Sequence, residues 1–232
     1  MPIVTLQQGF GGYTGCTDTW IVEPSQNNNC GGHASLLFGW EGSGNAYRTL
    51  MRWDLSSILA GSICASASLQ LYDQNYAGRT VNNPINIYQP SVANADWVAG
   101  TGNNTGSEVG SSSWNNKIYF TVPWAGSEGL STPTTDYVNT SLAAYTFIDG
   151  SSGYKTINFN AAGIAYLQTL FGGTGVGGLL IIGDQANNDS LTICDSANGT
   201  NTPKLEIVLA DSGVAQAFYR DFPKFLMRPT KP

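Results

Sequence analysis

The residues that could carry out catalysis are few and lie far apart in the sequence. His33 is the one histidine, and it follows an Asn-Gly-Gly loop with no catalytic motif around it. A serine nucleophile of the α/β-hydrolase type would need a G-x-S-x-G elbow, and the sequence contains none. Two carboxylates about 5–9 Å apart could hydrolyse a glycoside, but sixteen Asp and Glu residues allow many pairs. The sequence therefore predicts a protein that is not an enzyme.

An oxygen-rich stretch could hold a cation. Asp184, Asp189 and Asp195 lie near one another in the sequence, and Asn187 and Asn188 stand between the first two. Carboxylate and amide oxygens are ligands that Ca²⁺ prefers, although the spacing differs from that of an EF-hand. The stretch indicates a structural calcium site or, alternatively, solvated loop acids. No other cofactor is expected.

The four cysteines, Cys16, Cys30, Cys64 and Cys194, form no C-x-x-C pair. A zinc site would need four clustered ligands, so two disulfides are the favoured interpretation. Three connectivities are possible, and the expected one joins Cys16 to Cys30 and Cys64 to Cys194. The alternative is that all four are small buried apolar side chains.

Exposed aromatic rings could bind sugars, because the faces of sugars stack on them. Trp114 and Trp124 lie at the edges of polar loops, and Trp40 is a third candidate. For any single one of them, packing in a core or an interface is the favoured interpretation.

The elements that must position these side chains are short strands. Runs of alternating apolar and polar residues are separated by Gly, Asn, Ser and Pro, a pattern typical of an all-β sandwich. In one run, Leu205, Ile207 and Leu209 alternate with Glu206 and Val208, which places one set on the core face. The expected strands are Ile3–Leu6, Thr19–Glu23, Ser35–Gly39, Tyr47–Asp54, Ala67–Tyr72, Ile85–Gln89, Lys117–Val122, Ala144–Ile148, Lys155–Asn158, Gly178–Ile182, Leu191–Cys194 and Leu205–Leu209.

One short helix and two long loops interrupt this pattern. Asn160 can cap a helix whose apolar residues continue to Phe171, and Gly172 and Gly173 then end it. We expect this helix to lie across one end of the sandwich. The segments Val98–Asn116 and Ala125–Asn139 are rich in Gly, Ser, Thr and Asn and are expected to be loops.

The composition excludes several classes of protein. Only 11% of the 232 residues are charged, and the formal net charge is -6. An acidic chain repels phosphate, so no nucleic-acid partner is expected.

The apolar runs are too short to cross a membrane, and Met1–Gly12 lacks the features of a signal peptide. A polar, weakly charged chain without a signal peptide fits a protein released by cell lysis, as phage virion proteins are, while a recloned secreted chain is the other possibility.

Residues 211–232 differ from the rest of the chain. They hold four basic and two acidic residues, a net charge of +2, whereas residues 1–210 hold 6 basic and 14 acidic residues, a net charge of -8. Such an apolar segment would be costly to expose to water, so we expect this tail to dock on its own body or on a neighbouring chain. The residues expected to bind are Phe218, Tyr219, Arg220, Phe222, Phe225, Met227 and Arg228.

A block in the first third of the chain resembles the DNRLRE domain family, which is related to disaggregatase-type carbohydrate-binding modules. The block runs from Arg48 to Ile58 and continues into the strand Ala67–Tyr72, and Pro203–Ile207 resembles the family's closing strand. The resemblance covers about residues 10–210 and implies a jelly-roll β-sandwich without a catalytic centre. Within the block, Arg52 and Asp54 are expected to bind loop backbone.

These observations lead to two functional hypotheses. The first is a non-enzymatic virion protein of a phage, either a capsid decoration (cement) protein or a tail or fibre protein, which docks through residues 211–232. Its partners would be other virion proteins or copies of itself, and it would be extracellular after lysis. The second is a secreted carbohydrate-binding module or adhesin that binds host-surface glycans.

Overall fold

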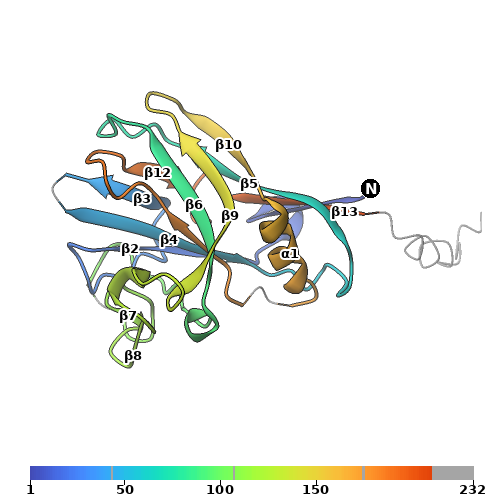
Figure 1. Ribbon diagram of the computed structural model, residues 1–232, viewed down its shortest axis with the longest axis horizontal. Coiled ribbons are helices and arrows are strands. Elements are labelled where there is room, and N and C mark those ends of the chain that lie inside the picture. Colours follow the sequence, from blue (N-terminus) through green and yellow to red (C-terminus); the bar gives the residue numbers. More distant parts are fainter. Residues whose placement is uncertain (43, 107, 174–175, 211–232) are drawn as a thin grey trace, which may run out of the picture.

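The structure, a computed structural model, is an all-β sandwich with one short α-helix (Figure 1), and it describes residues 1–42, 44–106, 108–173 and 176–210. Alternating apolar residues form the strands, as predicted. Within the described residues the strands are β1 (Ile3–Gln7), β2 (Cys16–Val22), β3 (Ser35–Glu41), β4 (Asn45–Trp53), β5 (Cys64–Asp73), β6 (Asn83–Pro90), β7 (Asn116–Ile118), β8 (Val122–Pro123), β9 (Tyr137–Phe147), β10 (Gly153–Asn158), β11 (Leu179–Ile182), β12 (Thr192–Asp195) and β13 (Lys204–Leu209).

The strands form two antiparallel sheets. Sheet A contains β1, β13, β5 and β10, together with β12 and the first half of β3. Sheet B contains β2, β4, β11, β6 and β9, together with the second half of β3. Strands β7 and β8 form a small separate pair. The prediction of a β-sandwich is therefore confirmed.

Strand β3 changes sheets at Gly39. Ser35–Phe38 pair with β12 in sheet A, whereas Gly39–Glu41 pair with β4 in sheet B. Gly39 has a φ angle of 116°, a conformation that side chains disfavour. A Cβ atom there would lie 2.8 Å from the Ser190 carbonyl oxygen and 2.9 Å from Asn83 Nδ2. This glycine therefore allows one strand to join both sheets.

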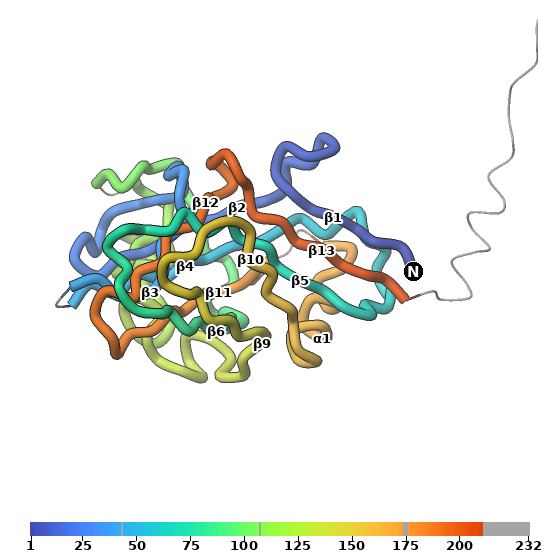
Figure 2. Tube along the Cα trace, turned by 90° about the horizontal axis from the view of Figure 1, so that it is seen from above, coloured from blue at the N-terminus to red at the C-terminus, as the bar shows by residue number. Residues whose placement is uncertain are grey.

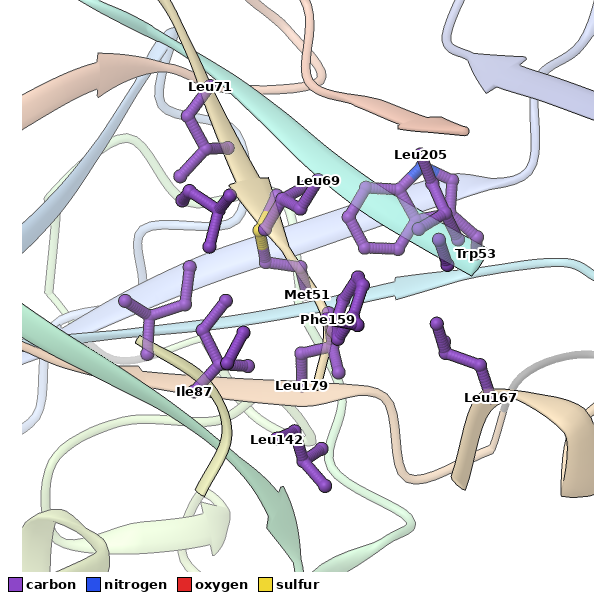
Figure 3. Packing of buried hydrophobic residues seen from close by; sticks show 14 of the residues in the cluster. Met51, Trp53, Leu69, Leu71, Ile87, Leu142, Phe159, Leu167, Leu179 and Leu205 are labelled. Atoms are coloured by element: carbon purple, nitrogen blue, oxygen red, sulfur yellow. The ribbon is translucent and has the colours of Figure 1, made fainter. Parts of the chain in front are cut away.

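The main core lies between the two sheets (Figure 3). Met51, Trp53 and Leu55 point into it, while Leu50 packs on the opposite face of sheet B, as the alternation along the strand predicts. Sheet A contributes Leu69 and other residues that face them from across the sandwich.

A single α-helix within the described residues, α1 (Ala161–Thr169), closes one end of this core. The Asn160 side chain caps it by accepting a 3.0 Å hydrogen bond from the Gly163 amide, and Gly172 follows it with a φ angle of 79°. The helix packs against β9 and β5 at one end of the sandwich (Figure 1). The predicted helix, its cap and its place are confirmed.

The region of the long loops differs from the prediction. A strand over Lys117–Val122 is wrong, because the chain turns between β7 and β8, where Phe120 has a φ angle of 70°. Strand β9 begins at Tyr137, inside the predicted loop Ala125–Asn139. Together with the β7–β8 pair, the remaining loop residues fold over the outer face of sheet B and bury a second apolar cluster there.

Replacing Gly39 tests the strand that joins the sheets. Gly39→Ala should lower the free energy of unfolding by about 3 kcal/mol, because the new Cβ must keep a left-handed φ while contacting backbone. Urea unfolding measures the change. Gly106→Ala is the control, since nothing lies within 4 Å of its added Cβ, and equal losses in the two variants would contradict the role of Gly39.

Candidate functional site

Two of the three candidate sugar-binding tryptophans are buried. Trp114 and Trp124 are only 5% and 4% exposed, because they pack on the outer face of sheet B. Trp124 Nε1 donates to the carbonyls of Ser113 and Trp114, and the Arg48 guanidinium lies 5.3 Å from the centre of the Trp114 ring. The hypothesis that these two rings are exposed platforms is wrong. Trp40 is half-buried and donates through Nε1 to the Gly42 carbonyl.

Asp136, a residue outside the predicted sites, organises the loop over these tryptophans. Its buried carboxylate accepts hydrogen bonds from the amides of Gly126, Ser127 and Thr132 at 2.8–3.0 Å and from Asn94 Nδ2 at 3.1 Å. A carboxylate with four donors orders the backbone without a metal ion. No local sequence pattern marks this aspartate, because its partners come from two separate segments.

The three candidate calcium ligands do not form one site. The Asp184 carboxylate binds the Ala186 amide and the Asn187 side chain, whereas Asp189 accepts from the Gly42 amide. Asp195 is bound by Asn201 and Gln74. Across the described residues, no group of three acidic, histidine or cysteine side chains could hold a metal ion. These carboxylates stabilise separate turns instead.

The predicted disulfides, Cys16–Cys30 and Cys64–Cys194, are wrong. All four cysteines carry free thiols and are buried. Burial raises the pKa of each thiol, that of Cys30 to about 12. The alternative, in which the cysteines serve as small apolar side chains, describes the structure.

The charged residues of the Arg48–Ile58 block bind backbone groups and nearby polar side chains. Arg52 donates to the Trp97 carbonyl at 3.3 Å, and Asp54 accepts from the Ser56 amide at 2.8 Å. Arg48 donates to the Gly129 carbonyl and to Gln185 Oε1. The block is structural, as expected for Arg52 and Asp54.

The outer face of sheet A is the surface on which accessible side chains gather. Tyr154, which is 44% exposed, packs edge-on against Tyr72 with 5.3 Å between the ring centres. Gln7 Nε2 donates to the Tyr154 hydroxyl at 3.4 Å, and Gln70 Nε2 donates to Glu206 at 2.6 Å. This face presents rings, amides and a carboxylate to solvent.

The two ends of the described chain meet at one end of this face (Figure 2). The Leu209 amide donates to the Pro2 carbonyl, and the Ala210 amide donates to the Ile63 carbonyl. Ile3 and Ile63, which are 65% and 53% exposed, lie beside these bonds. We call this pair the terminal patch. The expected binding residues of the tail lie outside the described residues; they are Phe218, Tyr219, Arg220, Phe222, Phe225, Met227 and Arg228.

Other ionisable side chains, the half-buried His33 and the buried Asp73 and Arg79, have structural roles. His33, the candidate for catalysis, accepts from the Ser35 amide and packs edge-on against Trp20. Asp73 and Arg79 form a fully buried ion pair at 2.9 Å. Neither arrangement places a nucleophile beside a base.

No family model matches the chain, and no match is found among curated proteins. The resemblance to the DNRLRE domain family stays a prediction. None of the helices within the described residues has the length and apolar character that a membrane span needs.

Asp18 should make stability depend on pH. It is buried and accepts from the Ala197 amide at 2.7 Å, and burial raises its pKa from 3.8 to about 7. The folded chain therefore holds a proton that the unfolded chain releases above about pH 4. Stability from this proton is fully present below that pH and falls as the pH rises to about 7, by about 4 kcal/mol at most.

The variant Asp18→Asn keeps the carbonyl acceptor and removes the titration. In urea unfolding between pH 4 and pH 8, it should gain stability relative to the wild type as the pH rises. Parallel pH profiles of the two proteins would show that Asp18 does not titrate in this range.

Proposed function

We propose that the protein is a non-enzymatic virion surface protein of a phage, a capsid decoration or a tail or fibre component, that docks through residues 211–232. The observation that carries the proposal is the meeting of β1, the end of β13 and the turn before β5 at one end of the sandwich. The tail follows directly from this end, beside the exposed terminal patch. Attachment at this end would leave the rest of the sandwich facing outward.

The remaining surface suits a protein exposed on a particle. The long loops seal the outer face of sheet B over a buried apolar cluster, and Asp136 fixes one of them with four hydrogen bonds. Residues 1–210 carry a net charge of -8, and the tail carries +2. The acidic body and the basic tail therefore attract each other, within one chain or between chains.

Deleting Ala217–Pro232 tests this function. The shortened chain should lose association with the virus particles whose genome encodes it, because one buried aromatic anchor contributes about 2 kcal/mol, or roughly thirtyfold in affinity. Sedimentation of particles with added full-length or shortened chain measures the bound fraction. The unfolding curve of the shortened chain is the control for folding, and undiminished binding by a folded, shortened chain would refute docking through the tail.

A second candidate function is glycan binding on sheet A. The observation that favours it is the exposed Tyr154 ring, which packs against Tyr72 and accepts a hydrogen bond from the amide of Gln7. Aromatic rings beside amide groups provide both stacking and hydrogen bonds for a sugar. The ligand would be a glycan of a host surface.

A glycan array tests this second candidate. Full-length protein should bind a subset of glycans, and Tyr154→Ala should weaken binding by about tenfold through the loss of one stacked ring. Phe120→Ala is the matched control, since Phe120 is 73% exposed on the β7–β8 turn. A blank array with folded wild-type protein, or equal binding by both variants, would exclude this face as a glycan site.

A further inference from the structure

We infer that a hollow on the outer face of sheet A is the receptor for an aromatic side chain of residues 211–232. The inference rests on the proposed function in one respect, since it takes this segment as the docking element. It adds the site into which the segment docks, in its own chain or in a neighbouring copy.

The hollow has a volume of about 220 Å³ and crosses four strands. In the sheet register, Ile3 lies beside Val208 and Val208 beside Ser66, while Ser68 lies beside Asn158. Because Ser66 and Ser68 are small, the surface is low beside the larger Ile3 and Val208 side chains of β1 and β13. The depression is therefore built into the sequence of β5.

The lining suits one ring better than a whole small molecule. Ile3, Val208 and Phe159 supply apolar contacts, and two serines and Asn158 supply polar groups. Pockets for drug-sized ligands usually measure about 300–1,000 Å³, so this hollow is smaller. A phenyl or phenol ring at the end of a peptide segment has the right size and chemistry.

The tail is close enough to supply that ring. Val208 lines the hollow, and Phe218 stands only eight positions after Ala210 in the sequence. Eight residues span at most about 26–29 Å, so each aromatic residue from Phe218 onward can return to the hollow. A tethered segment also has a high effective concentration at a nearby site.

Charge favours the same occupant. Glu206 lies at the hollow, with one carboxylate oxygen 2.6 Å from Gln70 Nε2 and the other 3.5 Å from Lys204 Nζ. Its side chain keeps 32% exposure. The tail places Arg220 and Lys224 next to aromatic residues, and the body that surrounds the hollow is acidic overall. The aromatic ring would enter the hollow while an adjacent basic group approaches Glu206.

Site-directed photocrosslinking of the full chain tests the inference. The exposed Asn158 is changed to Cys and labelled with a benzophenone maleimide; the four native thiols are buried and should not react. Light should link position 158 to residues 217–228, and mass spectrometry identifies the linked peptide. The matched control is the same label at Asn188→Cys, an exposed position in the β11–β12 loop.

Blocking the hollow gives the second arm of the test. Ser68→Trp should reduce the cross-link by about tenfold by occupying the space of the anchor, whereas Tyr72→Trp, on the same face outside the hollow, should leave it unchanged. Linkage within one chain or between two copies supports the inference. It is overturned if position 158 links to the tail no more than position 188 does, or if Ser68→Trp changes nothing.

The two proposals fail separately. If the cross-link is absent but the deletion of Ala217–Pro232 still abolishes binding to particles, the tail docks elsewhere and the proposed function stands. If the cross-link forms but the deletion leaves particle binding intact, the hollow binds the tail and the proposed mode of attachment is wrong.

Discussion

A buried network of polar side chains holds the two sheets together at the point where β3 passes between them. Arg79 pairs with Asp73 through two nitrogen–oxygen contacts and also donates to Thr192 Oγ1. Asn83 Nδ2 donates to the same hydroxyl and to the Phe38 carbonyl, one residue before Gly39. Such a pair is costly to desolvate, and removing one partner costs about 3–5 kcal/mol because the other charge stays buried. The two side chains therefore depend on each other, and through Thr192 and Asn83 they connect the two sheets.

The network also distinguishes the two ends of the sandwich. By fixing β3, β12 and β6 at one end of the sandwich, it leaves the opposite end to β1, β13 and the turn before β5. The sealed loops cover sheet B, and sheet A keeps an accessible outer face. The buried polar network and the accessible chain ends thus lie at opposite ends of the molecule. The surface proposed for docking is formed by paired strands and not by a loop.

Alternation along each strand is a local property, so the sequence predicted most strands and the helix with its Asn160 cap. The burial of Trp114 and Trp124 depends on loops returning to a distant sheet face, and a polar loop sequence does not reveal that return. The same limit applies to Asp136, which also binds Asn94 in another segment, and to Arg79, which donates to the distant Thr192. The disulfide prediction failed because cysteine counting cannot distinguish a bridge from four buried thiols.

The burial of the four thiols affects how the protein would respond to the redox state of its compartment. A fold that contains no bridging sulfur and exposes almost no thiol has the same covalent structure in a reducing and in an oxidising compartment. Such a fold would need no oxidase to mature. A fold whose stability does not depend on disulfides could form inside a cell and persist outside it. Hydrogen bonds and packing would then provide the stability that many secreted domains obtain from disulfides.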